Sequence, residues 1–272
     1  MDVQHERVTE FHRLHERGCF VMPNPWDAGS ARALEAMGFP ALATTSAGMA
    51  WTLGRPDNDV RLDEALTHLA AIAAAVRVPV NADFEGGYAV APEDVAANVA
   101  RATGTGIAGL SIEDSSGDPD EPLLDRDLAV ERVAAARRAI DASGTGVLLT
   151  ARSEGFVVGR PDLAETVRRL QAYAEVGADC LYAPRLGSVD QARAVVEAVA
   201  PKPVNLLVNA PFITVAEAAE LGVRRISVGG TLARAAWGGW LRVAQEIADE
   251  GTFTGFSDLP DVDGLQRRRQ AR

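Results

Sequence analysis

The sequence predicts an α/β protein, a (β/α)8 barrel in which eight parallel strands are surrounded by helices. Apolar runs of strand length alternate eight times with amphipathic helical patterns along the 272 residues. The second, fourth, sixth and eighth strands each follow a helix that ends in glycine. The third and seventh begin with proline instead, at Val78-Pro-Val-Asn81 and Lys202-Pro-Val-Asn205. Because alternate strands of a barrel fill alternate layers of its core, a difference between odd and even strands is expected.

A doubly wound open sheet is the alternative arrangement of the same elements. Such a sheet usually carries a phosphate-binding glycine motif after its first strand, and Pro23-Asn-Pro-Trp26 is not such a motif. The chain length is typical of one barrel. We therefore expect a single barrel domain over residues 1–272, with an N-terminal helix and a C-terminal helical extension.

The individual elements are recognised by their periodicity and their ends. The first helix carries apolar Val8, Phe11 and Leu14 on one face, and Asp27 is suited to cap the second helix. A long connection over residues 46–57 follows the second strand. The expected helices are residues 3–16, 28–37, 62–75, 92–102, 128–142, 162–176, 189–199, 215–221 and 232–249. The expected strands are residues 19–22, 41–45, 76–80, 108–112, 147–151, 180–183, 204–208 and 226–228.

The third strand ends in an unusual group of acids. Its apolar run stops at Asn81, Asp83 and Glu85, and two glycines and Tyr88 follow. Carboxylates at the rim of a core are costly unless a cation meets them. A hard divalent cation with oxygen ligands is a natural partner, and Mg²⁺ is the leading candidate. The alternative is an ordinary strand-to-helix loop that happens to be polar.

In a barrel, the carboxyl ends of the strands share one mouth, where active sites lie. Acids gather on the third and fourth strands, and Arg152 and Arg185 end the fifth and sixth. This set suits a metal ion beside an anionic substrate, although each arginine could instead be a structural partner for a rim acid. The strand ends are Ser46, Asn81, Asp83, Glu85, Glu113, Asp114, Arg152, Glu154, Arg185, Asn209 and Gly229.

The composition excludes several classes of partner. The net charge is −11, so nucleic acid and anionic membrane surfaces are poor partners, and the basic segment 267–272 is expected to be a solvated end. No apolar run approaches the ~20 residues of a membrane span, and the N-terminus is too polar for a signal peptide. Cys19 and Cys180 both lie in apolar runs. We expect them to be unpaired thiols in a reducing cytoplasm.

Several motifs, in order along the chain, resemble the isocitrate lyase / phosphoenolpyruvate mutase superfamily. They are Asn24-Pro-Trp-Asp-Ala-Gly-Ser-Ala31, Thr44-Thr-Ser-Ala-Gly48, Asn81-Ala-Asp-Phe-Glu-Gly-Gly-Tyr88, Ser111-Ile-Glu-Asp114 and Ala151-Arg-Ser153. The resemblance implies a barrel whose last helix is often exchanged between subunits, together with Mg²⁺, for which Mn²⁺ is the alternative. It also implies a 2-oxo acid or its enolate at the mouth. Members make or break C–C or P–C bonds.

The resemblance also assigns roles to residues that match its motifs. Ser46, with the backbone of Ala47 and Gly48, matches the turn that holds the substrate carboxylate. Asp83 matches the principal metal ligand, and Asp57 an acid near the metal. Adding the strand-end residues, we expect metal ligands at Asp83, Glu85 and Glu113, and catalytic roles for Asp57, Glu113 and Arg152. The expected substrate-binding residues are Trp26, Ser46, Ala47, Gly48, Arg152, Arg185 and Asn209.

Two departures from the family pattern restrict the reaction. The usual first aspartate of the third strand is Asn81 here, and Glu85 is an extra acid. The lyase branches carry a lysine-cysteine-glycine-histidine signature after the fourth strand. Residues 115–124 contain no cysteine, histidine or lysine, which argues against authentic isocitrate or methylisocitrate cleavage. The loop also has no match to the lysine- and asparagine-bearing lid of the mutase.

These observations predict an enzyme: a Mg²⁺-dependent lyase that cleaves a C–C bond of a small 2-oxo or 2-hydroxy (di)carboxylic acid through an enolate, similar to an oxaloacetate decarboxylase or a methylisocitrate lyase. A phosphoenolpyruvate mutase or phosphonopyruvate hydrolase is the alternative enzyme. A catalytically quiet 2-oxo acid binding protein is a third possibility.

The last helix and tail carry Trp237, Trp240, Leu241, Phe253 and Phe256. This apolar surface predicts a homodimer or homotetramer.

Overall fold

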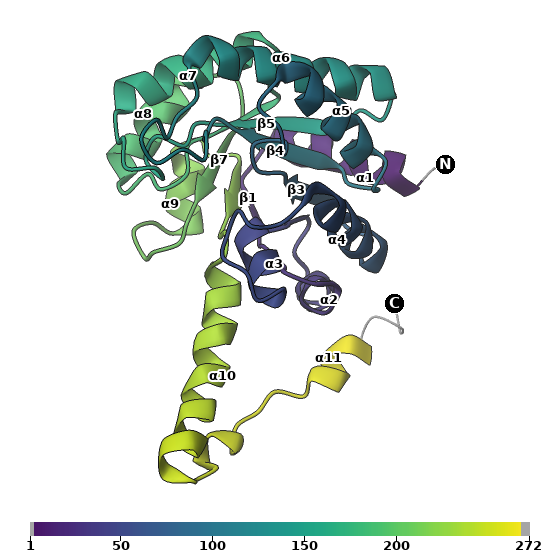
Figure 1. The fold of residues 1–272 in the computed structure, drawn as a ribbon, viewed down its shortest axis with the longest axis vertical. Helices are drawn as coiled ribbons and strands as arrows, with labels where there is room; N and C mark the ends of the chain where they lie inside the picture. The colour runs from purple at the N-terminus through teal and green to yellow at the C-terminus, as the bar shows by residue number, and fades with distance from the viewer. Residues whose placement is uncertain (1–2, 268–272) are drawn as a thin grey trace.

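The computed structural model describes residues 3–267, and its eight parallel strands form a nearly closed barrel (Figure 1). The strands are β1 (Phe20–Met22), β2 (Leu42–Ala43), β3 (Val80–Asp83), β4 (Gly109–Glu113), β5 (Leu148–Arg152), β6 (Cys180–Tyr182), β7 (Val204–Leu207) and β8 (Arg225–Ser227). The helices are α1 (Val3–Glu16), α2 (Ala28–Ala36), α3 (Ser46–Thr52), α4 (Leu62–Ala75), α5 (Pro92–Thr103), α6 (Arg126–Ser143), α7 (Leu163–Glu175), α8 (Val189–Val199), α9 (Val215–Glu220), α10 (Thr231–Glu250) and α11 (Val262–Arg267). The predicted (β/α)8 fold is confirmed.

Strand order explains how the barrel closes. The strands lie in the order β1-β8-β7-β6-β5-β4-β3-β2, and every pair is parallel. The seam between β1 and β2 is bridged by a hydrogen bond from the Ala43 amide to the Pro23 carbonyl, 3.1 Å long. All eight carboxyl ends therefore surround one mouth. At the opposite end, α1 contacts β5 and buries Phe11 against the barrel.

The third strand lies further along the chain than predicted. β3 comprises Val80–Asp83, not residues 76–80, because Val76 is the C-terminal cap of α4. Asn81 is buried inside the barrel and pairs with Gly109 of β4. A Cβ atom on Gly109 would lie 2.7 Å from the Asn81 side chain and 2.6 Å from the ring of Phe11. The apolar run suggested an apolar strand, whereas this part of the barrel interior is polar.

The connection predicted over residues 46–57 contains a helix instead. α3 begins directly after β2 and is capped by the Thr45 hydroxyl, which accepts a hydrogen bond from the Gly48 amide at 3.3 Å. A Cβ on Gly48 would lie 2.9 Å from the Cβ of Trp26. The glycine suggested a loop, but it is needed for close packing against Trp26. α3 matters for function because its first residues lie at the mouth.

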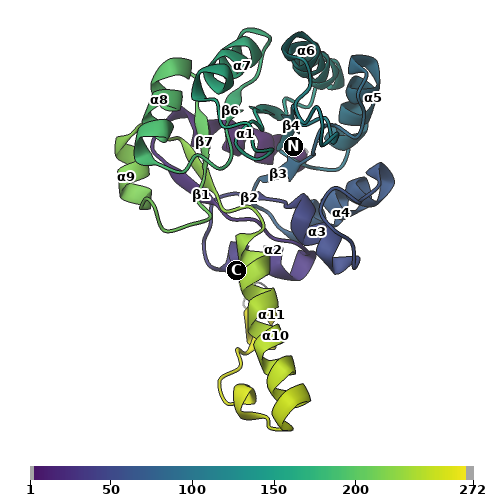
Figure 2. The same cartoon turned by 60° about the vertical axis from the view of Figure 1, so that its left-hand side comes forward.

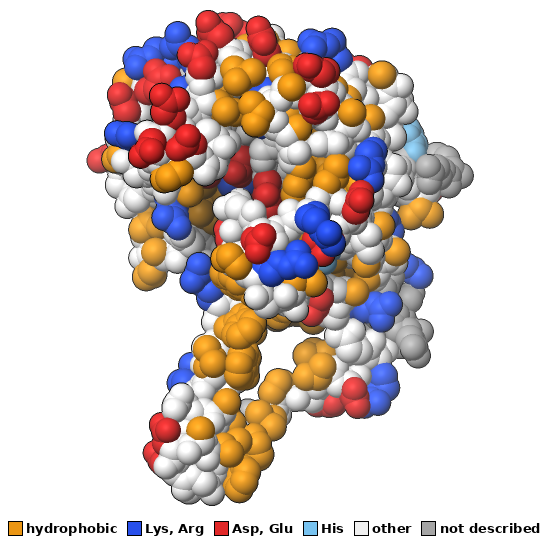
Figure 3. Space-filling view, in the orientation of Figure 1, with side chains coloured by type: hydrophobic (Ala, Val, Ile, Leu, Met, Phe, Trp, Pro, Cys, Tyr) orange, Lys and Arg blue, Asp and Glu red, His pale blue; other side chains and the backbone are white. Residues whose placement is uncertain are grey.

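The C-terminal elements extend away from the barrel as an arm (Figures 1 and 2). α10 projects outward and buries only Ala233 of its described residues, and the chain returns through a 3₁₀ turn, Thr254–Phe256, to α11, which contacts α2. α10 confirms the predicted last helix, while α11 was not predicted. Hydrophobic side chains cover much of the arm (Figure 3). Of the basic segment 267–272, only Arg267 is described, at the end of α11, and residues 268–272 lie outside the described residues. No helix in the described part of the chain is long and apolar enough to cross a membrane.

Candidate functional site

A pocket opens at the mouth of the barrel, with a cavity volume of about 200 Å³. Most of the residues predicted to bind substrate or act in catalysis line it, and they come from five different strand ends or loops. Glu113 pairs with Arg152 but does not line the pocket, and neither do Trp26, Gly48 and Glu85. The predicted residues in its wall are Ser46, Ala47, Asp57, Asp83, Arg152, Arg185 and Asn209.

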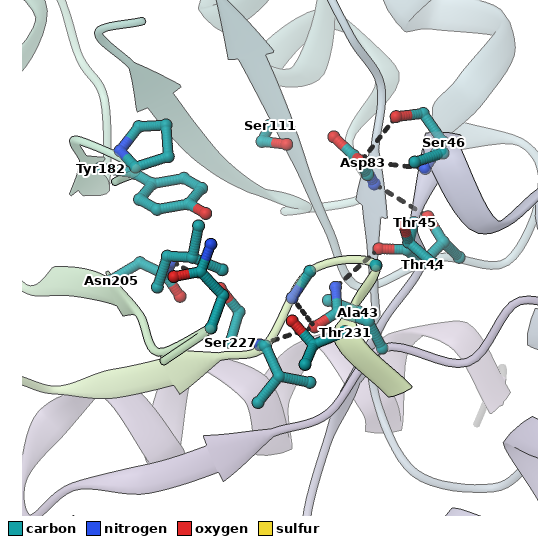
Figure 4. Close-up of a pocket in the computed structure, with 18 of the residues that line it drawn as sticks. Ala43, Thr44, Thr45, Ser46, Asp83, Ser111, Tyr182, Asn205, Ser227 and Thr231 are labelled. Carbon is teal, nitrogen blue, oxygen red and sulfur yellow. Dashed lines mark hydrogen bonds between the residues drawn. The ribbon is translucent and has the colours of Figure 1, made fainter. Parts of the chain in front are cut away.

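Asp83 is fixed at the pocket by the start of α3 (Figure 4). Its Oδ2 atom accepts hydrogen bonds from the amide and the hydroxyl of Ser46, each 3.0 Å long. Its own amide donates to the Thr44 hydroxyl at 2.9 Å, and the Ser46 hydroxyl also lies 3.3 Å from Asp57. The Ser46 turn therefore orients two of the predicted acids toward the same space.

Arg152 lies at the centre of the site and pairs with three carboxylates. The distances are 2.6 Å to Asp83, 3.0 Å to Glu113 and 2.9 Å to Glu154. The guanidinium also lies 5.3 Å from the ring centre of Tyr182. Burial lowers the pKa of Arg152, but the carboxylates outweigh this effect and hold it well above its usual value. Arg152 is thus both a partner of rim acids and a cation of the pocket wall.

The site contains more negative than positive charge. Burial, followed by repulsion from Asp83, raises the pKa of Asp57, and burial also raises the pKa values of Glu113 and Glu154. For Glu85, burial and then the charges of Asp83 and Asp57 raise the pKa to about 7. The Glu85 Oε1 atom is buried without a hydrogen-bond partner. Five carboxylates around one guanidinium leave an excess that an additional cation would neutralise.

This donor set fits Mg²⁺, although no three His, Cys, Asp or Glu side chains in residues 3–267 converge on one ion position. Mg²⁺ usually keeps several waters and takes only one or two carboxylates from a protein, so three converging side chains are not required. Asp83 and Glu85 are the residues that would contact the ion directly. Asp57 and Glu113 would hold its waters. The unpaired Glu85 oxygen and the excess of acids are the observations that support this fit.

Left-handed backbone conformations occur at three non-glycine residues of the mouth. The φ angles are 47° at Glu85, 56° at Tyr88 and 61° at Arg185. Such angles are uncommon for residues with a side chain and often mark functional positions. Arg185 is exposed, lines the pocket and forms no ion pair with any described residue. The rim acid Glu154 pairs with Arg152 rather than with Arg185.

Other strand-end residues have structural roles. Asp114 does not line the pocket: it binds the Glu154 amide at 2.7 Å, Arg169 at 3.2 Å and the Tyr173 hydroxyl at 2.6 Å. Asn24 ties three strand ends together, since its side chain donates to the Thr44 carbonyl and accepts from the amides of Val228 and Gly229. The family motif that begins at Asn24 therefore has a structural basis.

Sequence reasoning missed several polar residues of the pocket. Tyr182 lies across the pocket from Asp83 and its hydroxyl points toward the pocket, whereas Ser111 lies beside Asp83, its partner in the β3–β4 register (Figure 4). Ser227 and Arg225 come from the last strand, and Arg234 from the first turn of α10. Tyr182 is the last residue of β6 and lies two residues before Pro184, so its position at a strand end could have identified it. Ser111 and Arg225 lie deeper in the strands and carried no such signal.

Comparison with known proteins extends these observations. Residues 11–248 match the sequence profile of the family described as phosphoenolpyruvate phosphomutase. An uncharacterized protein of Mycobacterium tuberculosis is 36% identical over 221 residues, which are 80% of this chain and 81% of that protein. The crystal structure of a candidate lyase/mutase from Burkholderia cenocepacia has a TM-score of 0.93 at 46% identity and covers 98% of this chain and 96% of that one. The structure of 2,3-dimethylmalate lyase has a TM-score of 0.85 at 27% identity, with 96% and 94% of the two chains covered.

Proposed function

The chain belongs to the phosphoenolpyruvate mutase/isocitrate lyase superfamily, and from this premise we propose that it is a Mg²⁺-dependent lyase that cleaves a C–C bond of a small 2-oxo or 2-hydroxy (di)carboxylic acid through an enolate. The observation that carries the proposal is Asp83, held between the Ser46 turn and Arg152 in a pocket with excess acid. The similarity to 2,3-dimethylmalate lyase supports carbon–carbon chemistry. Bound Mg²⁺ would act as a Lewis acid that stabilises negative charge on the 2-oxo oxygen.

The protein residues would bind and orient the acid. Arg152 offers a guanidinium whose planar donors match a carboxylate. In the turn before α3, the Ser46 amide binds Asp83 and the Gly48 amide binds the Thr45 hydroxyl. The Ala47 amide has no hydrogen-bond acceptor among the described residues, so it is the donor of this turn that remains for a substrate carboxylate. Asn209 and Arg185 line the outer part of the same pocket.

Proton transfer would fall to the acids with raised pKa values. Asp57 lines the pocket, and its pKa is raised chiefly by burial. A carboxyl group with a raised pKa can exchange a proton near neutral pH. For a 2-hydroxy acid, Asp57 would remove the hydroxyl proton as the adjacent bond breaks. For decarboxylation of a 2-oxo acid, Asp57 would return a proton to the enolate carbon.

One experiment tests the proposal directly. The enzyme would be incubated with a panel of 2-oxo and 2-hydroxy acids, with Mg²⁺ or with EDTA, and the products identified by mass. We expect Mg²⁺-dependent release of CO₂ or of a carbonyl fragment from at least one acid. Turnover of phosphonopyruvate without release of CO₂ or an aldehyde would favour a phosphoenolpyruvate mutase or phosphonopyruvate hydrolase instead, an alternative supported by the match to the phosphomutase family.

The catalytically quiet binding protein is favoured by the loop after β4. Residues 115–124 contain no cysteine, histidine or lysine, and the loop is closed by a bridge between Ser115 and Leu123 and a hydrogen bond from the Ser116 hydroxyl to the Glu121 carbonyl. Thermal stabilisation by oxo acids without turnover across the panel would select this possibility. In such a binding protein, the metal site and the carboxylate site would be intact, and only the reaction would be absent.

We also propose that the protein works in the cytoplasm as a homodimer or homotetramer. The described residues contain two free thiols, half-buried Cys19 and buried Cys180. Unpaired thiols suit a reducing compartment. The arm leaves large apolar side chains exposed, including Trp240 at 50% and Phe253 at 59%. A second subunit that exchanges α10 would cover them.

A further inference from the structure

Arg225 is buried inside the barrel, beneath the pocket. It begins β8, is 1% exposed, and lies two residues before Ser227 on the same strand. Within residues 3–267, its guanidinium contacts only neutral side-chain atoms and the Phe11 ring, whose centre lies 5.9 Å away. The contacts are Asn205 Oδ1 at 3.0 Å, Thr150 Oγ1 at 2.9 Å, Asn81 Oδ1 at 3.4 Å and His15 Nε2 at 3.3 Å.

The positive charge of Arg225 has no negative partner among residues 3–267. Buried Arg169 and half-buried Arg152 each pair with at least one carboxylate. His15 adds no charge, because burial and the charge of Arg225 lower its pKa to about 3. The nearest acidic groups are the Cys180 thiol and the Tyr182 hydroxyl, whose pKa values are both raised by burial, so that both are neutral at pH 7. A buried cation without compensation is unfavourable.

The pocket reaches this cation. Asn81, Asn205, Ser227 and Arg225 all line its deep end, and no carboxylate comes from these strand positions. The Ser227 oxygen accepts a hydrogen bond from the Asn205 amide at 2.9 Å, and the Ser227 side chain is also a hydrogen-bond partner of Tyr182. The pocket therefore has two zones. The acidic zone lies beside Asp83, and the floor offers a guanidinium surrounded by neutral polar side chains.

We propose that the floor of the pocket is an anion subsite in which Arg225 binds one small monovalent anion. The guanidinium is almost completely enclosed, so only a halide-sized ion or the end of a carboxylate can reach it. The anion would neutralise the buried charge and connect β3, β7 and β8 beneath the substrate. No step of the proposed reaction uses Arg225, so this subsite goes beyond that function. The anion in this subsite could be a free inorganic ion or a carboxylate of the acid bound above.

Arg132 provides the contrasting structural role. It is also a fully buried arginine without a carboxylate at hydrogen-bond distance, but it lies outside the pocket. Its guanidinium donates to the backbone carbonyls of Glu113, Gly86 and Ala89, and so holds the chain after β3. If Arg225 only connected strands in the same way, no anion would be needed. Arg132 is therefore the matched control.

Crystals of the wild-type protein soaked in sodium bromide test the site without any substitution. We expect an anomalous bromine peak within hydrogen-bond distance of the Arg225 guanidinium. Soaking with 2-oxoglutarate or 2-oxovalerate, which differ in the terminal carboxylate, then identifies the source of the charge. If 2-oxoglutarate displaces bromide and 2-oxovalerate does not, the negative charge at Arg225 comes from the terminal carboxylate of the acid. If bromide stays at Arg225 beside either acid, the charge comes from a free ion. Both results support the subsite, and the absence of any peak at Arg225 contradicts it.

Thermal unfolding gives the solution counterpart. At constant ionic strength, replacing methanesulfonate with bromide should raise Tm of the wild type and of Arg132→Gln by about 2–4 °C, because an ion that binds only the folded state stabilises it. The rise should vanish in Arg225→Gln and persist in part in Arg225→Lys. A rise that is equal in all variants, or absent from the wild type, would overturn the proposal. Neither measurement depends on turnover, so failure of the proposed reaction is distinguishable from failure of the subsite.

Discussion

The Oδ1 atom of Asp83 lies 2.6 Å from Nη1 of Arg152, while Oδ2 of the same carboxylate accepts two hydrogen bonds from Ser46. One carboxylate thus joins the guanidinium of β5 to the first turn of α3. A metal ion that binds Asp83 must share or displace these contacts. Metal binding, the position of Arg152 and the orientation of the Ser46 turn are therefore expected to be coupled.

The first prediction concerns Asp83 as a metal ligand. Substitution by alanine should abolish Mg²⁺-dependent binding of oxalate, a two-carbon analogue of an enolate, with a loss of roughly 100-fold or more. The fold should persist, because Asp83 lies at the pocket and its side chain is 20% exposed. Calorimetric titration with and without Mg²⁺ measures the effect, with exposed Asp94→Ala as a control. Unchanged Mg²⁺ dependence in Asp83→Ala would show that the metal binds elsewhere.

The second prediction concerns pH. The pKa of Glu85 is about 7 in the folded protein, above the usual value near 4.5, because of burial and neighbouring acids. Between these values the folded state holds a proton that the unfolded state has released. Stability should therefore fall as pH rises from about 4.5 to 7 without Mg²⁺, by up to about 3 kcal/mol from this residue.

The pKa values of Asp57, Glu113 and Glu154 are also raised, and these residues are unchanged in Glu85→Gln. The difference between this variant and the wild type therefore isolates the contribution of Glu85. Urea unfolding in EDTA at pH 5 and pH 8 should show a smaller loss of stability in the variant than in the wild type. Mg²⁺ should reduce the loss in the wild type, because it stabilises the charged carboxylate. An identical pH slope in both proteins would mean that Glu85 titrates as an ordinary exposed acid.

Much of the fold could be predicted from the sequence, because alternating apolar periodicity and the glycine or proline before each strand are local signals. The strand ends also identified Asp83, Arg152 and Arg185, since parallel strands must place their carboxyl ends together. Local signals could not show that Arg152 lies among three carboxylates or that the interior contains Arg225. Those positions depend on which strands face each other across the barrel.

α3 was missed for a related reason. Its sequence, Ser46-Ala-Gly-Met-Ala-Trp-Thr52, contains a glycine and is too short to show a clear helical period. The helix forms because Thr45 caps it and because Gly48 packs against Trp26. Neither contact can be read from the local sequence. The packing of Gly48 on Trp26 is a tertiary contact, and the cap at Thr45 depends on where β2 ends. The motif Thr44-Thr-Ser-Ala-Gly48, which the family resemblance singled out, spans the end of β2 and the start of α3.

The third prediction concerns assembly through the arm. Trp237, Trp240 and Leu241 of α10 are 37%, 50% and 48% exposed in the isolated chain. Exposed apolar patches of this kind usually bind a partner. Light scattering at micromolar concentration should show a dimer or tetramer, and the double variant Trp240→Ser with Leu241→Asp should shift it toward monomer.

A matched control separates assembly from general surface change. Met37, at the end of α2, is 70% exposed and lies outside the arm, so Met37→Asp should leave the mass unchanged. A wild-type protein that is monomeric at micromolar concentration would remove the assembly proposal altogether. In that case the apolar side chains of the arm would need another explanation.

The last prediction concerns Arg185 and the charge of the substrate. Arg152 already contacts three acids, whereas Arg185 forms no ion pair with a described residue, lines the pocket and has a left-handed backbone. A free, oriented guanidinium at the mouth suits a second carboxylate. Dicarboxylates such as oxaloacetate or 2-oxoglutarate should therefore bind more tightly than pyruvate.

Arg185→Lys tests this role because lysine keeps the charge but loses the paired donors of the guanidinium. Binding of the dicarboxylate should weaken by about 1–3 kcal/mol, the range for hydrogen bonds to charged groups, while pyruvate binding should hardly change. Calorimetric titration of both ligands against both proteins measures the difference. Equal losses for pyruvate and the dicarboxylate would mean that Arg185 supports the rim of the pocket rather than the ligand. Since Arg185 lies at the mouth and Arg225 at the floor, the bromide measurements should be unaffected by Arg185→Lys, which keeps the two cations experimentally distinct.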